Sequence, residues 1–318
     1  MRILGPTISS LLALAWVACG RSEAAPASAS APASAPAPAS APASAPASAP
    51  ALASAPAPAF QHGTACGALG CLQFDSPGDA FLDAIAGDPL AVGIGEVHAP
   101  KGATVASAAK RFTDDLLPLL AGRASDLLVE LMMPPRGCVD AVAVVRNKQA
   151  PVAQRQAETN QSDYVTMGDR ARALGIVPDA LRPTCADMDA IREAPSAIDA
   201  SLERIATMIR IQAERLVERD ERSDGDRGKL VVIYSGALHN DLAPPPTTAR
   251  WSYAPELDEY CHGRFIAIDL VVPEFIGEDD TWRSLSWWPH YDRSRMGAKT
   301  TLLRTGDRSF VLVFPETR

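Results

Sequence analysis

Several signals of common protein classes are missing from this chain of 318 residues. Its formal net charge is −8 and no run of Lys and Arg occurs, which excludes the concentrated basic face that nucleic-acid phosphates require. After residue 20 no apolar run approaches the roughly 20 residues of a membrane-spanning helix. A P-loop, a dinucleotide-binding fingerprint and an HExxH zinc motif are also missing. These absences leave an export signal, a spacer and a globular body to interpret.

The first 19 residues have the pattern of an export signal. Arg2 supplies a charged start, an apolar run continues to Ala18, and "WVAC" ends at Cys19. This resembles a bacterial lipoprotein signal, in which the cysteine becomes the lipidated first residue of the mature chain. Ordinary secretory cleavage a few residues later is the alternative. Both readings predict an exported protein of the bacterial cell envelope. Lipidation would hold it on a membrane, which we expect to be the outer membrane.

A low-complexity segment follows the signal. Residues 24–59 contain only Ala, Pro and Ser except for Leu52. Such a sequence cannot bury a core, and its prolines favour an extended polyproline-like form. We therefore expect residues 20–60 to be a disordered tether, whose 36 low-complexity residues could reach about 110 Å. The alternative is an arbitrary insert without a spacing role.

Five cysteines remain beyond the signal. Cys66 and Cys71 are close enough to form a small local loop, and Cys138 and Cys185 each follow an expected strand and could meet across it. Cys261 would then be free. The connectivity cannot be read from the sequence, and none of the spacings is that of a zinc knuckle.

Residues 61–318 alternate between strand-like and helix-like patterns, which predicts one three-layer α/β domain with a mostly parallel sheet flanked by helices. The last strands, around Gly306-Asp307, should form an antiparallel hairpin at the sheet edge. The expected strands are 89–98, 125–133, a weak one within 181–189, 229–241, 264–273 and the two in 300–315; the expected helices are 103–121, 151–174 and 197–220.

Reactive side chains follow three of these strands. The stretch "LAVGIGEVHAP" ends in Glu96 and His98, which are two positions apart and so share a face. The second strand ends in Glu130, and the strand in 229–241 ends in His239. Because ligands bind beyond the carboxyl ends of parallel strands, we expect these four side chains to form a catalytic site. Each histidine taken alone could instead be structural.

Two chemistries fit these residue types. Glu96, His98 and His239 could ligate a divalent metal ion. Without metal, a histidine could remove a proton from water while a glutamate orients its ring. Gly93, Gly95 and Gly236 lack side chains near the strand ends, which would leave space for a ligand to approach; they, too, are expected features of the site.

An aromatic segment, "WRSLSWWPHYD" at residues 282–292, is a second candidate region. It could form a pocket wall or lid that stacks on a flat or sugar-like ligand, or it could simply pack over the sheet edge. The residues that could contact a cofactor, with the tyrosines and His290 as possible haem ligands, are Tyr234, Trp287, Trp288, His290 and Tyr291.

The strand-end motifs resemble those of a known superfamily. "GIGEVH" resembles the GExH opening shared by the haem-uptake lipoprotein ChaN, the erythromycin esterases and the TIKI/TraB proteins. "LLVELM" resembles the acid-bearing second strand of ChaN-like domains, and "VVIYSGALHND" resembles a late strand that ends in Gly-x-x-His. The resemblance covers roughly residues 88–272. It implies a three-layer α/β fold and a site made of Glu96, His98, Glu130 and His239.

The resemblance does not imply one activity, because its members include esterases, proposed metal-dependent peptidases and haem-binding lipoproteins. The expected function is an envelope lipoprotein with a hydrolase-like Glu/His site, with or without a divalent metal, that acts on a small molecule. A non-enzymatic haem- or ligand-binding lipoprotein on the same fold is the first alternative. A structural surface protein with a vestigial site is the second.

Overall fold

The computed structural model describes residues 63–317. The predicted signal, the predicted lipidation site Cys19 and the predicted tether 20–60 lie outside the described residues. Within that range, no helix is both long and apolar enough to cross a bilayer.

One sheet runs through the described part of the chain. Its strands are β1 (Thr64–Ala65), β2 (Leu72–Phe74), β3 (Ala91–Glu96), β4 (Ala124–Met132), β5 (Val177–Leu181), β6 (Leu230–Gly236), β7 (Phe265–Val271), β8 (Thr300–Gly306) and β9 (Ser309–Val313). They pair in the order β1-β2-β8-β9-β7-β3-β6-β4-β5. The six strands from β9 to β5 are parallel, whereas β8 is antiparallel to both β9 and β2.

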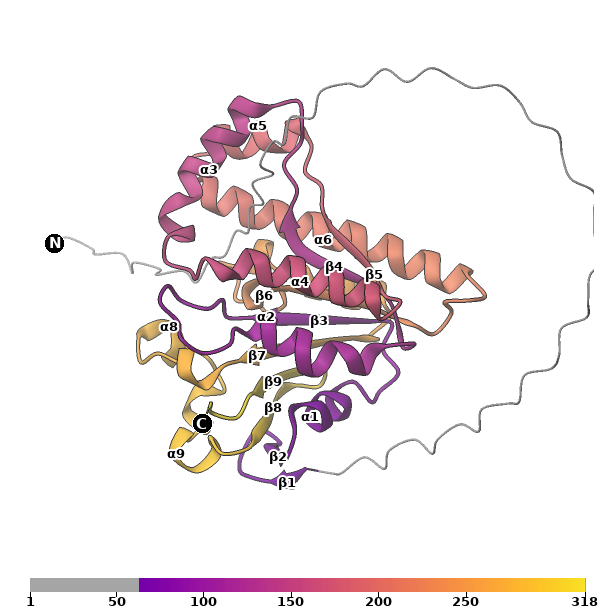
Figure 1. Ribbon diagram of the computed structural model, residues 1–318, viewed down its shortest axis with the longest axis vertical. Helices are drawn as coiled ribbons and strands as arrows, with labels where there is room; N and C mark the ends of the chain where they lie inside the picture. Colours follow the sequence, from indigo (N-terminus) through magenta and orange to yellow (C-terminus); the bar gives the residue numbers. More distant parts are fainter. Residues whose placement is uncertain (1–62, 318) are drawn as a thin grey trace, which may run out of the picture. The chain divides into compact units, whose positions relative to one another are not determined.

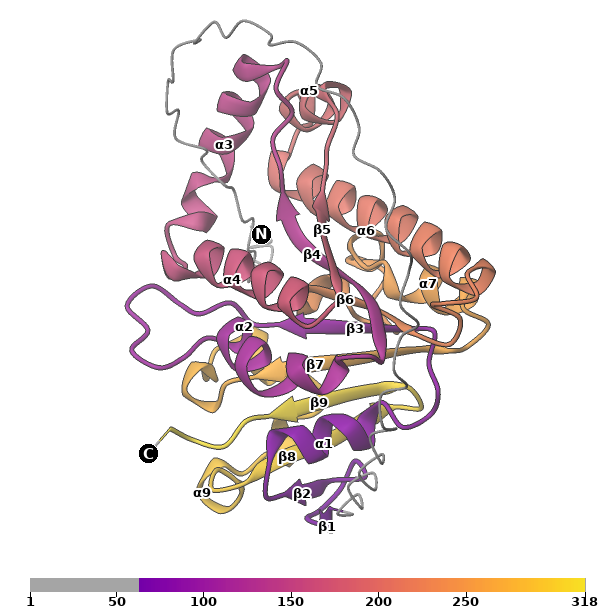
Figure 2. The ribbon, with the colours of Figure 1, turned by 45° about the vertical axis from the view of Figure 1, so that its right-hand side comes forward.

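This topology confirms the expected α/β fold with a mostly parallel sheet and a C-terminal antiparallel hairpin. The hairpin does not form the edge of the sheet, contrary to the prediction. Strand β9 inserts beside β7, and the short strands β2 and β1 extend the sheet beyond β8. Figure 2 shows the arrowheads of β3, β7 and β9 on the same side, so the segments that follow these strands leave from one edge.

Helices cover both faces of the sheet (Figure 1). The helices are α1 (Pro77–Ala84), α2 (Ala108–Arg111), α3 (Val139–Ala153), α4 (Thr159–Ala173), α5 (Cys185–Glu193), α6 (Ala197–Arg222), α7 (Ala254–Tyr260), α8 (Asp280–Arg283) and α9 (Arg293–Met296). Apolar residues of α1, α2 and α4 pack in one core against the sheet, and those of α3, α5, α6 and α7 pack in a second core. Burial on both faces explains why β3 and β4 are apolar without polar alternation.

Two predicted elements have different boundaries in the structure. The helix expected over 103–121 begins after Ser107, whose side chain caps α2, and continues as a π-helical segment, η1 (Phe112–Leu116). Pro118 lies in the first turn of a separate 3-10 helix, η2 (Leu117–Leu120), which confirms the expected restart at this proline. The helix expected over 151–174 is α4, preceded by the unpredicted α3, and it ends just before Gly175.

The prediction of a strand within 181–189 is largely wrong. Strand β5 ends at Leu181, and α5 begins at Cys185. Thr184 and Asp187 form a capping box, in which each side chain accepts a hydrogen bond from the other residue's backbone N–H. This reciprocal cap starts a helix where the sequence interpretation continued a strand.

Two disulfides join the pairs that sequence proximity and strand order favoured. Cys66 bonds to Cys71, Cys138 bonds to Cys185, and Cys261 is free and buried. The second bond connects the segment after β4 to the first residue of α5. It therefore ties together the chain segments that leave two neighbouring parallel strands.

Candidate functional site

Glu96, the last residue of β3, is buried and surrounded by hydrogen-bond donors. The hydroxyl of Tyr164 on α4 donates to Oε1 at 2.5 Å, and the hydroxyl of Tyr234 on β6 donates to Oε2 at 2.7 Å. Nδ1 of His98 lies 2.6 Å from Oε1. The carboxylate thus has a partner on both oxygens, which offsets the cost of burying its charge.

Burial and mutual attraction shift the pKa values of Glu96 and His98 in opposite directions. Burial alone would raise the pKa of Glu96, but attraction to His98 and hydrogen bonds from His98, Tyr164 and Tyr234 bring it below its usual value. Burial alone would lower the pKa of His98, but Glu96 and then Glu130 raise it above its usual value. The pKa values of both tyrosines are raised by burial and by Glu96, so these hydroxyls keep their protons and remain donors.

The other nitrogen of His98 faces the remaining predicted residues. A Cβ placed on Gly236, at the end of β6, would lie 3.5 Å from His98 Nε2, 3.6 Å from Glu130 Oε2 and 3.9 Å from His239 Cδ2. The two imidazoles therefore approach one another within about 8 Å, close enough to act on one small group. The structure brings Glu96, His98, Glu130 and His239 together, as the sequence predicted, but their chemical roles stay a prediction.

Glu130 and His239, the other two residues next to Gly236, are almost fully buried. Glu130 Oε2 accepts the backbone N–H of Gly236 at 2.7 Å. Nδ1 of His239 lies 2.6 Å from the carbonyl oxygen of Trp251, and Nε2 lies 3.7 Å from Glu130 Oε1. Because a carbonyl can only accept, His239 carries a proton on Nδ1 and presents Nε2 toward Glu130.

The turn that holds His239 is attached to the sheet by its neighbour. Asn240 donates to the carbonyl of Gly93 at 3.2 Å and to Asp269 Oδ1 at 3.3 Å, and it accepts from Tyr253 at 3.2 Å. Burial raises the pKa of Asp269 to about 7, although the hydrogen bond from Asn240 opposes this. The network fixes η3 (Ala237–His239) on the sheet.

The expected space beside two of the three glycines is filled by the chain itself. A Cβ on Gly93 would overlap Oδ1 of Asn240, and one on Gly95 would overlap Oδ1 of Asp269. Of the three glycines that the sequence pattern singled out, only Gly236 faces the site residues and leaves ordinary contact distances. Because Gly93 and Gly95 have no side chains, Asn240 and Asp269 can pack against β3, and no space for a ligand remains beside these two glycines.

The predicted metal ligands do not form a ready coordination set. Within residues 63–317 no group of three His, Cys, Asp or Glu side chains is placed to hold a metal ion. Glu96, one of the three predicted ligands, already accepts from two hydroxyls and pairs with His98. A metal would have to displace these donors, so the geometry of Glu96 fits a partner of His98 better than a metal ligand.

The predicted cofactor-contacting residues do not form one group, because Trp287, Trp288 and Tyr291 share an apolar cluster to which Tyr234 and His290 do not belong. The hydroxyl of Tyr234 is buried and donates to Glu96. Trp287 and Tyr291 belong to an apolar cluster with Val311 and Val313 of β9, and His290 is exposed. The aromatic segment therefore packs over the sheet, which is the second of the two alternatives that the sequence left open. These residues do not form a haem cavity with an available axial ligand.

Sequence reasoning missed three contributors to the site. Tyr164 contacts both Glu96 and His98 Nδ1, the latter at 3.3 Å; Trp251 fixes the His239 ring; and Tyr253 supports Asn240. All three lie far from the strand-end motifs in sequence or on segments without a strong pattern. The one available signal was Tyr164 itself, an aromatic residue in an otherwise polar helix.

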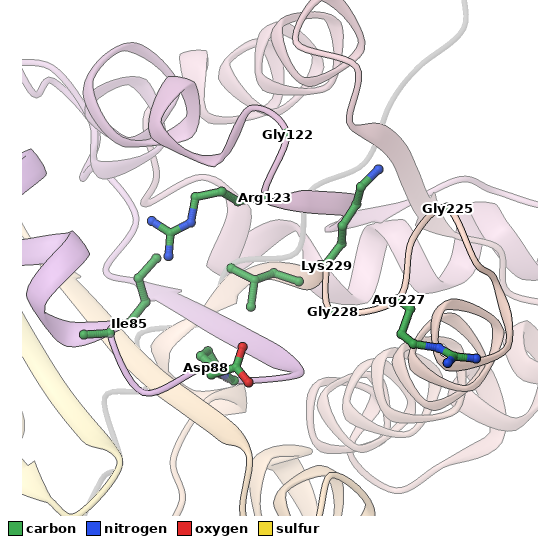
Figure 3. A pocket seen from close by; sticks show the side chains of 11 residues that line it. Ile85, Asp88, Gly122, Arg123, Gly225, Arg227, Gly228 and Lys229 are labelled. Atoms are coloured by element: carbon green, nitrogen blue, oxygen red, sulfur yellow. The ribbon is translucent and has the colours of Figure 1, made fainter. Parts of the chain in front are cut away.

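Two described pockets lie at the opposite end of the strands from the site. The larger, about 470 Å³, borders the starts of β4 and β6 and is lined by Asp88, Arg123, Arg227 and Lys229 among others (Figure 3). Asp88 pairs with Arg264, Lys229 with Asp226 and Arg227 with Asp224. Because this pocket lies at the other end of the strands, it is separate from the site at the strand ends.

No protein-family model matches the chain, and no curated protein sequence matches it. Among solved structures, the crystal structure of a Bacillus cereus protein is similar over 76% of this chain and 92% of that one, with 10% sequence identity and a TM-score of 0.37. A likeness at this level gives no information on activity.

Proposed function

We propose that this protein is an exported, membrane-tethered hydrolase in which His98 activates water. One observation carries the proposal. Glu96 fixes Nδ1 of His98 inside the protein, and Nε2 is directed toward the position beside Gly236 that Glu130 and His239 also border. A buried carboxylate on one ring nitrogen and a free second nitrogen are the arrangement of a general base.

The proposed reaction uses only groups of this chain. Nε2 of His98 takes a proton from a water molecule, and the water oxygen attacks the carbonyl carbon of an ester or amide. Glu96 stabilises the imidazolium that forms, as the raised pKa of His98 reflects. When the bond to the leaving group breaks, the imidazolium returns the proton to the departing oxygen or nitrogen.

The two tyrosines have a supporting role in this proposal. By donating to Glu96, Tyr164 and Tyr234 keep the carboxylate ionised at a buried position. An ionised Glu96 in turn holds the proton of His98 on Nδ1 and leaves the lone pair on Nε2. Kinship with the ChaN, TIKI/TraB and erythromycin esterase superfamily is part of the same proposal. It is supported by the location of the three motifs at β3, β4 and β6.

Export is proposed on separate grounds. Structural disulfides persist in oxidising compartments and are rare in the cytoplasm. The two disulfides of the described part therefore support secretion, in agreement with the signal-like N-terminus. Lipidation at Cys19 and attachment to the envelope follow from the sequence pattern alone.

Hydrolysis of 4-nitrophenyl acetate and of a short peptide anilide by the full chain tests the proposal. His98→Gln should lower turnover by about two to four orders of magnitude, because the general base is removed. His290→Gln, at an exposed position outside the site, is the matched control and should retain full turnover. Turnover by His98→Gln equal to that of the wild type would refute the role of His98.

A further inference from the structure

Glu130 and His239 face one another as two acceptors with no donor between them. The carbonyl of Trp251 accepts the proton on Nδ1 of His239, so in the neutral form of the ring Nε2 has a lone pair. Glu130 Oε1 lies 3.7 Å from this nitrogen, which is beyond hydrogen-bond range. Within the described residues, buried Oε1 has no hydrogen-bond partner.

The nearby donors of the chain are already engaged elsewhere. The Gly236 N–H goes to Oε2 of Glu130, and the hydroxyls of Tyr164 and Tyr234 go to Glu96. The hydroxyl of Tyr253 donates to Asn240. A buried carboxyl oxygen without a donor is costly, and Oε1 is therefore available to a donor from outside the chain.

One atom fits beside Gly236, next to the Glu130 carboxyl group and the His239 ring. An added atom at the Cβ position would lie 3.5 Å from His98 Nε2, 3.6 Å from Glu130 Oε2 and 3.9 Å from His239 Cδ2, which are ordinary contact distances. The charges nearby also select the kind of donor. Among the described residues, no Lys or Arg lies within ion-pair distance of Glu96 or Glu130, whose basic neighbours are His98 and His239. Two buried carboxyl groups without a Lys or Arg disfavour an anion and favour a cation.

We infer that the Glu130–His239 pair is a subsite for a primary ammonium group of the substrate. One N–H would donate to Glu130 Oε1 and a second to His239 Nε2. The substrate class would be an ester or amide that has an amino group close to the bond that is cleaved. This inference rests on the proposed function, because it takes the ligand to be the substrate on which His98 acts.

Binding of methylammonium, followed by the ¹⁵N resonances of the His239 ring, tests the subsite. Methylammonium should shift the Nε2 signal, because this nitrogen becomes an acceptor. Tetramethylammonium has the same charge but no N–H, and it should not produce the shift. The full chain has five histidines, so His239→Gln identifies the signals by their loss.

Glu130→Gln supplies a sharper comparison. The amide oxygen can accept from Gly236 while its NH₂ group faces His239 Nε2, so the chain provides the missing donor itself. Methylammonium should then bind about tenfold more weakly or worse, since a charge-assisted hydrogen bond is lost. Glu278→Gln, at an exposed position in the segment after β7, is the matched control and should bind like the wild type.

The outcomes separate this inference from the proposed function. An equal response to both ammonium ions, or no shift of His239 in the wild type, would overturn the subsite even if Glu130→Gln failed to fold. Selective methylammonium binding that persists in His98→Gln would support the subsite whether or not any ester or anilide is hydrolysed. Hydrolysis that depends on His98 without any preference for amino-bearing esters would uphold the proposed function and reject the subsite.

Discussion

Nδ1 of His98 lies 2.6 Å from Oε1 of Glu96, and both side chains come from the same strand end. The spacing of two residues places them on one face of the extended chain. The Tyr164 hydroxyl completes the contact, because it donates to the same oxygen and lies 3.3 Å from the same ring nitrogen. The pair is therefore a fixed unit whose proton is held on the inner side of the ring.

Glu96→Gln should change the pH dependence of turnover. A general base acts when it is neutral, so the rate should rise with pH through the pKa of His98, which Glu96 raises above its usual value of 6.5. Removal of the negative charge lowers this pKa and moves the acidic limb of the rate profile to lower pH. The plateau should fall about a hundredfold or more because the imidazolium loses its partner. A limb that stays in place would show that Glu96 does not control His98.

Gly95→Ala should destabilise the fold although it only adds a methyl group. The new Cβ would overlap Asp269 Oδ1 and lie 2.9 Å from the Cα atom of Ala237. Overpacking of this kind costs about 1–3 kcal/mol in the free energy of unfolding. Gly87→Ala is the matched control, because nothing lies within 4 Å of its added Cβ. Urea unfolding measures both, and equal midpoints would contradict the close packing of β3 against Asp269.

The two disulfides should differ in their contributions to stability. The Cys138–Cys185 bond closes a separation of 47 residues and the Cys66–Cys71 bond one of 5. In the chain-entropy treatment the longer loop contributes about 2 kcal/mol more, because it restricts the unfolded chain more strongly. Replacement of each pair by serines, followed by urea unfolding, measures the difference. A larger loss from the Cys66–Cys71 pair would contradict this expectation.

Much of the fold followed from local patterns. The long apolar runs of β3, β4, β6 and β7 predict strands buried on both faces, and a parallel sheet puts their carboxyl ends at one edge. That is sufficient to predict the proximity of Glu96 and His98, and to place Glu130 and His239 at the same edge. The α5 helix was missed because a cap made by Thr184 and Asp187 outweighs the strand-like composition around it.

The rest of the site depends on tertiary packing. Tyr164 reaches Glu96 because α4 packs on the face of the sheet toward which Glu96 points, which no local pattern of a polar helix reveals. The roles of Gly93 and Gly95 were misjudged for a similar reason. A glycine in a strand indicates close approach, but only the structure shows that Asn240 and Asp269 are the approaching groups.

Asp269→Asn should remove a pH-dependent loss of stability. The native carboxyl has a pKa of about 7, above its ordinary value of 3.8, because burial disfavours the charged form. Between these values the native state binds more protons than the unfolded state, so the free energy of unfolding falls as pH rises and then stays low above pH 7. Asparagine cannot ionise, and its Oδ1 can still accept the hydrogen bond from Asn240.

The difference between the unfolding free energies of Asp269→Asn and the wild type should therefore grow in favour of the variant from about pH 4 to pH 7 and remain constant above it. Urea unfolding at a series of pH values measures this difference, in which the titrations of Glu96 and His98 largely cancel because both proteins contain them. Asp241→Asn is the matched control, because Asp241 contributes to the raised pKa of Asp269 without replacing it. In Asp241→Asn, which keeps Asp269, the free energy of unfolding should still fall as pH rises, but by less than in the wild type. A difference that does not vary with pH would mean that Asp269 is ionised in the native protein throughout this range. The group that accepts the hydrogen bond from Asn240 would then be a carboxylate and not a carboxylic acid.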